Sequence, residues 1–303
     1  MIASLQEIKG RHRLDCSWFG AVNMIVSSVG MDRLLAHRWP ANASLVSILV
    51  RLMPNSWLDQ ALAQDAGRKS LREANVHGWT PLHHATAASS TKAVRKILLF
   101  DDEMGTLRLH QTKLKRIALH NACLTNNAKV VDLLLERNGK EQRLSCCKNH
   151  CMPVHLAAGI GADGCILQRL LAEHAAEQTL ARTLVLNRNA LMCAVAAKAP
   201  SLVRQLLAVE TTLADQLEAI DSRGQAAADY AREVGDADII RQIASASQSL
   251  SLASSSAATG MAPGRTAQPR DNESPASMTL SLTSPETEVY PYSPEGEADR
   301  EVQ

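Results

Sequence analysis

One segment recurs along this chain at a nearly constant interval, and this repetition restricts the possible folds more than any other feature of the sequence. Its clearest copy runs from Asn75 to Ala85, and we take His83 within it as a register mark. The equivalent marks downstream are His120, His155, Met192 and Asp229. The intervals between successive marks are 37, 35, 37 and 37 residues, and a second apolar segment with helical spacing follows each mark. Two helices recurring at such a period predict a stack of repeats.

The residues around His83 suit the start of a helix after a tight turn. Gly78 allows a positive φ, Thr80 can cap the helix, and Pro81 fixes φ in its first turn. With Asn75 in the Asp place, the stretch resembles the ankyrin repeat motif D-x-x-G-x-T-P-L-H-x-A. The resemblance implies an all-α ankyrin-repeat solenoid over residues 75–244, with five repeats of which the last two are degenerate. The period exceeds the usual length of about 33 residues, and we expect the extra residues in the outer loops.

Two flanking regions lack this pattern. Residues 1–74 contain two amphipathic segments, 43–51 and 56–66, followed by a connecting turn at 67–70. We interpret 1–74 as a helical N-terminal cap, because stacked repeats need an atypical end. The alternative is a degenerate repeat that pairs residues 31–37 with 44–52.

Residues 245–303 are rich in serine and proline and lack helical periodicity, which predicts a disordered acidic tail. Eight acidic residues and one arginine lie in 271–303, so this part carries a net charge of −7, while the whole chain carries +1. Such a tail either solubilises the chain or competes for a basic surface elsewhere on it.

The composition excludes several classes of protein. The seven cysteines are odd in number and scattered, which argues against a disulfide framework and favours a reducing compartment. No apolar run approaches the roughly 20 residues that span a bilayer. The near-neutral charge and the 3% of aromatic residues give no reason to expect nucleic-acid binding. We therefore expect a monomer in the cytoplasm, or in the nucleus, with no membrane partner.

The residues with catalytic or metal-binding chemistry do not form a recognisable site. His83, His120 and His155 lie one per repeat, so they cannot converge on one substrate, and the resemblance implies that each fixes the turn before a helix. Four cysteine and histidine side chains lie between Cys146 and Cys151, but the C-x-x-C pairs of strong zinc motifs are absent. We predict no catalytic residue, no metal site and no cofactor.

The resemblance also implies where a partner binds. Ankyrin stacks use the loop before each first helix, here called a finger, together with the concave face of the first helices. The residues carried across to these fingers are Val76, His77, Trp79, Lys113, Leu114, Arg116, Lys148, Leu186, Arg188 and Arg223. Aromatic, aliphatic and basic side chains together are typical of interface cores. In the other interpretation, Trp79 packs on its own surroundings and the basic residues are only solvated.

We therefore predict a non-enzymatic protein–protein interaction module, a scaffold or adaptor. The alternative is a regulatory subunit or inhibitor of an enzyme that docks through residues 1–74.

Overall fold

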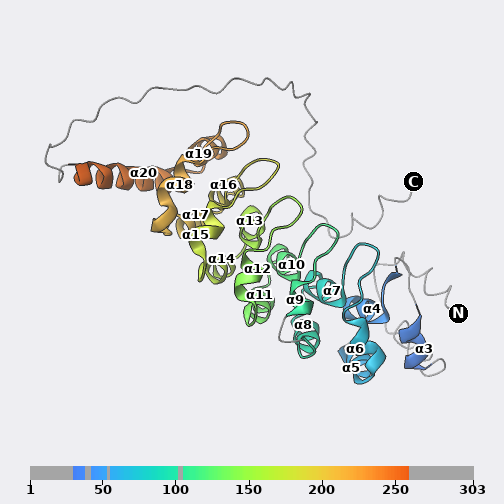
Figure 1. Cartoon of the computed structure of the whole chain (residues 1–303). Helices are drawn as coiled ribbons and strands as arrows, with labels where there is room; N and C mark the ends of the chain where they lie inside the picture. The colour runs from blue at the N-terminus through green and yellow to red at the C-terminus, as the bar shows by residue number, and fades with distance from the viewer. Residues whose placement is uncertain (1–29, 38–41, 53–54, 102–104, 259–303) are drawn as a thin grey trace, which may run out of the picture. The chain divides into compact units, whose positions relative to one another are not determined.

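The computed structural model describes residues 30–37, 42–52, 55–101 and 105–258 (Figure 1). The chain divides into two units, Met1–Ser249 and Leu250–Gln303. Within the described residues the secondary structure is helical, apart from isolated bridge residues at Ala43, Ile220 and Ala226. The prediction of an all-α solenoid is therefore confirmed, and the helix pairs lie in the first unit.

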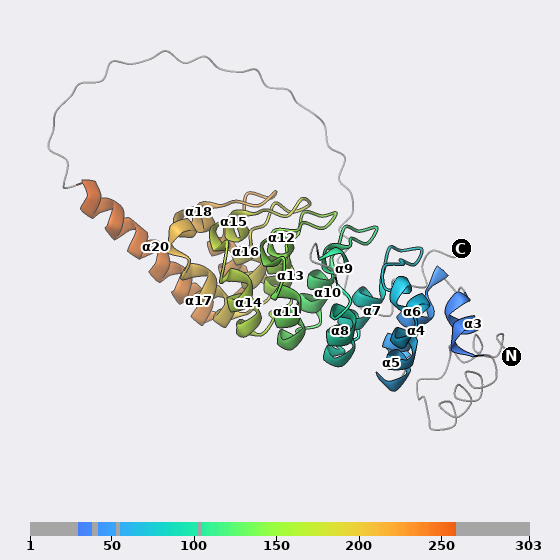
Figure 2. The same cartoon turned by 60° about the horizontal axis from the view of Figure 1, so that its bottom comes forward.

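Helix pairs follow one another along the first unit in two rows. The first row contains α7 (Pro81–Ala87), α10 (Ala118–Leu124), α13 (Pro153–Gly159), α16 (Ala190–Ala196) and α19 (Ala227–Val234). The second row contains α8 (Thr91–Leu98), α11 (Ala128–Leu135), α14 (Gly164–Leu171) and α17 (Pro200–Leu207), and α20 (Ala237–Ala258) follows α19. Each first-row helix packs on the next, and α8, α11, α14 and α17 do the same (Figures 1 and 2).

The core lies between the rows and consists of small and aliphatic side chains. Leu82, Val94 and Ile97 are fully buried in the first clear repeat, and equivalent side chains are buried in the later ones. Short helices with alanine and leucine at these positions pack closely without large aromatic groups.

Left-handed backbone recurs at two fixed places in every repeat. Five residues before each mark stand Gly78, Lys115, His150, Asn187 and Gly224, all with φ between 52° and 78°. Six residues after each mark stand Ser89, Asn126, Gly161, Lys198 and Gly235, with φ between 53° and 71°. Glycine is required most clearly at Gly78, where an added Cβ would lie 2.8 Å from the backbone nitrogen of Lys113.

The two rows extend one helix pair further toward the N-terminus than the five repeats that carry the motif. Helix α4 (Leu45–Leu52) packs on α7, and α5 (Asn55–Ala63) packs on α8. Ser47 lies 36 residues before His83, and its hydroxyl oxygen is 3.1 Å from that of Ser44. The Ser44–Ser47 pair takes the place that the Thr80–His83 pair has in the next repeat. The suggested pairing of residues 31–37 with 44–52 is wrong, because 45–52 is a first-row helix. Helix α3 (Met31–Ala36) packs against α4, α5 and the short helix that follows them.

The residues that lengthen the repeat form short helices after each second-row helix. These are α6 (Asp65–Ser70), α9 (Thr106–Leu109), α12 (Gly139–Arg143), α15 (Ala175–Leu180) and the 3-10 helix η3 (Glu210–Thr212) with α18 (Leu213–Glu218). The predicted turn at 67–70 is wrong, because these residues belong to α6. Gly67 allows α6 to pack closely, since a Cβ there would collide with the carbonyl oxygen of Ala61.

A long polar side chain ties most of these short helices to the preceding one. Gln142, Gln178 and Gln216 are fully buried, and each donates its side-chain amide to a carbonyl near the end of the second-row helix, that of Leu134 in the first case. Arg68 does the same for the carbonyl of Leu62, at 2.8 Å. These bonds satisfy carbonyl groups that a helix end leaves without partners.

Helix α20 continues to Ala258 and corrects the proposed tail boundary at residue 245. The Ser247 and Ser249 hydroxyls donate to carbonyls four residues earlier, each at 3.0 Å, and so pair within the helix. In the second unit the described residues are the last turns of α20, from Leu250. Residues 259–303, which hold the acidic part of the proposed tail, lie outside the described residues.

Candidate interaction surface

The five fingers comprise residues 75–79, 112–116, 147–151, 183–188 and 221–225. Backbone hydrogen bonds join each finger to the next: Lys113 N donates to His77 O at 3.0 Å, Lys148 N to Leu114 O at 2.8 Å, Leu184 N to Asn149 O at 2.9 Å, and Ser222 N to Leu186 O at 3.0 Å. Figure 1 shows the fingers as a row of loops along one side of the helices. The bonds fix the spacing and register of the finger tips.

Three buried histidines support the fingers from below. In His120, Nδ1 accepts the backbone N–H of Ile117 at 3.2 Å, while Nε2 lies 3.0 Å from the carbonyl oxygen of Cys151 in the next finger. His83 and His155 make the same pair of contacts, reaching the carbonyl oxygens of Arg116 and Ala181. Each imidazole therefore joins its own helix start to the neighbouring repeat.

Burial keeps these imidazoles neutral. It lowers the pKa of His83 to about 3 and that of His120 to about 4, although in each the hydrogen bond to a backbone carbonyl acts in the opposite direction. The pKa of His155 is lowered by burial as well. A ring with Nδ1 as acceptor and Nε2–H as donor satisfies both contacts in its neutral form.

The two degenerate repeats use other side chains for the same turn. In the fourth, Asn189 caps α16 by accepting the N–H of Met192 at 2.9 Å and donates to the carbonyl of Gln216 at 2.9 Å. In the fifth, the Asp229 carboxylate accepts the N–H of Ala226 at 2.8 Å. A helix start thus keeps its cap where histidine is absent.

The structure places all ten predicted partner-binding residues in or next to the finger tips. Six are exposed: Val76, His77, Lys113, Leu114, Lys148 and Arg223. Four are half-buried: Trp79, Arg116, Leu186 and Arg188.

Two of the half-buried residues make internal contacts. The Trp79 ring lies 5.2 Å from that of His84 and 6.1 Å from that of His83. The Arg188 guanidinium lies over the Tyr230 ring at 4.7 Å and donates to its hydroxyl at 2.6 Å, and this hydroxyl donates to Asp221 at 2.7 Å. The fourth and fifth fingers are therefore linked through the Tyr230 hydroxyl, which joins the Arg188 guanidinium to the Asp221 carboxylate.

The most exposed apolar residues of the fingers were not in the predicted set. Leu184 is 62% exposed and Val185 is 67% exposed. The fourth finger is one residue longer than the others, since Thr183 N bonds to Arg188 O across six residues, whereas Thr112 N bonds to Arg116 O across five. The extra residue places both Leu184 and Val185 at the exposed tip of this finger.

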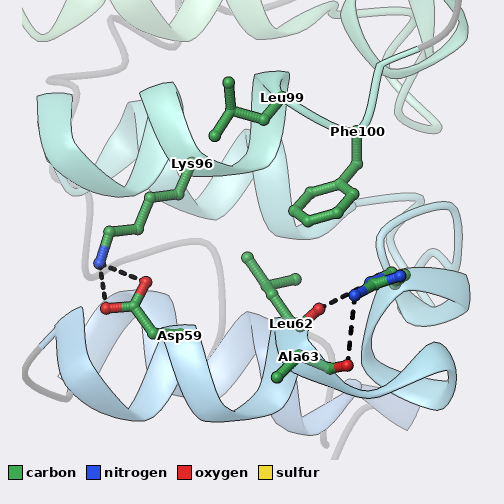
Figure 3. Close-up of a pocket in the computed structure, with 7 residues that line it drawn as sticks. Asp59, Leu62, Ala63, Lys96, Leu99 and Phe100 are labelled. Carbon is green, nitrogen blue, oxygen red and sulfur yellow. Dashed lines mark hydrogen bonds and ion pairs between the residues drawn. The ribbon is translucent and has the colours of Figure 1, made fainter.

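The described residues form an open pocket of about 460 Å³, lined by Leu180, Arg182, Asp215, Glu218 and Ala219, and a smaller pocket at the N-terminal end of the stack. The smaller pocket, of about 270 Å³, lies between α5, α6 and α8, where Lys96 pairs with Asp59 and the Arg68 guanidinium bonds to the carbonyls of Leu62 and Ala63 (Figure 3). Leu99, at its edge, is 76% exposed. Small-molecule sites usually have volumes of roughly 300–1,000 Å³. The smaller pocket falls below that range and is separate from the fingers.

Two kinds of feature are absent from the described part of the chain. No helix in it is both long and apolar enough to cross a bilayer. Among the same residues, no three His, Cys, Asp or Glu side chains are grouped so that they could hold a metal ion.

Comparisons with known proteins agree with this geometry. The sequence model of the family "Ankyrin repeats (3 copies)" matches residues 42–144, a stretch that begins just before α4. No curated protein matches the chain. Among 412 matching chains of solved structures is the ankyrin repeat domain of Bcl-3, described as a unique member of the IkappaB protein family. It is 19% identical, with a TM-score of 0.54, and the match covers 66% of this chain and 85% of that one. The recurring helix pairs, the bonded fingers and the family match over residues 42–144 together show that this chain has an ankyrin-repeat fold.

Proposed function

We propose that this chain is a non-enzymatic scaffold or adaptor that binds a protein through its finger tips and the adjoining ends of the first-row helices. The observation that carries the proposal is the exposure of apolar side chains in fixed register on the fingers: Val76 at 44%, Leu114 at 38%, Leu184 at 62% and Val185 at 67%. Ile160, at the end of α13, adds a fifth at 41%. Apolar groups gathered on one side of a rigid surface are typical of interaction sites.

The positive charge of the fingers favours a partner with an acidic surface. Lys113, Lys115 and Lys148 are exposed on the second and third fingers, next to Leu114. A partner surface with an apolar centre and acidic groups around it would complement this arrangement, and long-range attraction would raise its association rate. The proposal also places the chain in the cytoplasm or nucleus, as a monomer that binds neither nucleic acid nor membrane.

The test compares binding by variants of the full chain. Proteins captured from a cell extract by the wild type are identified, and each is then purified and titrated against the wild type, a Leu184→Ser/Val185→Ser variant, a Lys113→Glu/Lys148→Glu variant and a Leu99→Ser control. We expect at least a tenfold loss of affinity for both finger variants and none for the control.

Two results would overturn the proposal. One is a set of partners that bind both finger variants as tightly as the wild type. The other is loss of binding in the Leu99→Ser variant alone. That result would show that the partner binds on the α5–α8 side, as expected of a regulatory subunit that docks through its N-terminal segment.

A further inference from the structure

Every finger begins with a residue whose side chain meets backbone N–H groups of its own turn. Asn75 Oδ1 accepts from the N–H groups of His77 at 3.0 Å and Trp79 at 2.9 Å. Asp221 Oδ1 accepts from Arg223 at 2.7 Å and Gln225 at 2.9 Å. Thr112 and Thr183 each accept one such bond, at 3.1 and 3.0 Å. The turn therefore requires a hydrogen-bond acceptor at its first position.

In the third finger that position is occupied by Cys147. The finger closes like the others, with Cys147 N donating to Cys151 O at 3.0 Å. The Cys147 sulfur takes the place of these oxygen acceptors, near the N–H groups of Asn149 and Cys151, and the Cys151 thiol donates to the carbonyl oxygen of Asn149 at 3.7 Å. A thiol is a poor acceptor, whereas a thiolate is a good one, so the turn stabilises the ionised form of Cys147.

The acidity of the cysteines differs accordingly. The hydrogen bond from the Cys151 thiol, helped by the two N–H groups and by the charge of Arg116, lowers the pKa of Cys147 well below its usual range, against the effect of burial. The same pairing raises the pKa of Cys151. Burial alone raises the pKa of Cys123 to about 12, and it is the main cause that raises the pKa of Cys193 to about 11.

We propose that Cys147 and Cys151 form a redox-active pair, in which the Cys147 thiolate reacts with hydrogen peroxide and Cys151 then closes a disulfide within the third finger. First, the Cys147 sulfur attacks one peroxide oxygen, the O–O bond breaks and hydroxide leaves, which gives a sulfenic acid. Next, the Cys151 sulfur attacks the sulfenic sulfur, the S–O bond breaks, and water leaves with the Cys151 proton. The two thiols lose two electrons, and the peroxide gains them.

The finger geometry suits this pairing and restricts the oxidant. The bond from Cys147 N to Cys151 O places the two residues opposite each other at the ends of the turn, and disulfides join Cα atoms roughly 4.4–6.8 Å apart. Cys147 is only 6% exposed, which admits a small oxidant such as peroxide more readily than a bulky one. Cys146, the neighbouring alternative, directs its thiol to the carbonyl oxygen of Leu144 at 3.8 Å, and its pKa is raised by burial.

The experiment uses the reduced full chain, treated with hydrogen peroxide and then alkylated, digested without reductant and examined by mass spectrometry. We expect a peptide linked between Cys147 and Cys151, with Cys146 and Cys193 alkylated. Cys151→Ser should leave Cys147 as a sulfenic acid that dimedone traps. Cys146→Ser should still form the disulfide.

A Cys147→Asp variant provides the matched control. Aspartate occupies the same turn position at Asp221, so this finger should remain folded, and Cys151 should then stay unoxidised. The proposal is overturned if Cys147 reacts no faster than Cys123 or Cys193. It is equally overturned if Cys151 is oxidised as readily in Cys147→Asp, or if the disulfide requires Cys146.

Discussion

At the scale of single residues, the histidine marks connect repeats as well as capping helices. His120 bonds to its own helix start and to the carbonyl of Cys151, 31 residues away. The sequence predicted the capping role from the motif. It did not indicate the contact with the next repeat, because that contact depends on how the repeats stack.

Replacing His120 with alanine should therefore lower the free energy of unfolding by about 1–3 kcal/mol, since a buried carbonyl and a buried N–H lose their partner. Urea unfolding followed by circular dichroism measures the change. His77→Ala, at an exposed finger position, is the control and should leave stability nearly unchanged. Equal midpoints for the two variants would contradict the structural role of His120.

Acid should destabilise the fold through the same side chains. The folded-state pKa of His83 is about 3 and that of His120 is about 4, both below the value of about 6.5 in the unfolded chain. Their contribution to stability is thus complete above pH 6.5 and is lost as the pH falls toward 4. Between pH 8 and pH 5 each should contribute about 2 kcal/mol to the decrease. His120→Gln should show a smaller decrease over this range, and an unchanged pH dependence would refute the assignment.

At the scale of elements, the sequence predicted the paired helices well and the connections poorly. Helices α7, α10 and α13 follow the motif, but α12 and α15 have only five and six residues, too few for a periodic pattern to reveal. Glutamine at one position of successive repeats, as at Gln142 and Gln178, was the available signal. The segment after residue 245 is predicted to be disordered because it is serine-rich and lacks helical periodicity, although Ser247 and Ser249 bond within α20.

The short helices should contribute measurably to stability. Gln178 is fully buried, and its amide donates to the carbonyls of Leu170 at 2.7 Å and Glu173 at 2.8 Å. Gln178→Ala should cost about 1–3 kcal/mol, because both carbonyls lose their donor. Gln168→Ala, on the exposed side of α14, changes the same residue type without this loss. Chemical unfolding of both variants tests the prediction, which fails if they are equally stable.

At the scale of the whole molecule, stability should spread through neighbouring repeats, so the pair α4–α5 should protect the repeats that follow. Val46 and Leu58, fully buried on α4 and α5, lie at this end of the stack. Each large apolar side chain that is wholly buried contributes roughly 1.5–3 kcal/mol to the free energy of unfolding.

A chain that starts at Asn75 should melt at a lower temperature than the full chain, and its amides in α7 and α8 should exchange hydrogen faster. A chain that ends at Ser249 keeps every helix pair and should melt at the same temperature as the full chain. Calorimetry and hydrogen exchange on the three chains measure both effects. If the chain from Asn75 matched the full chain in both, α4 and α5 would be an appendage rather than part of the stack.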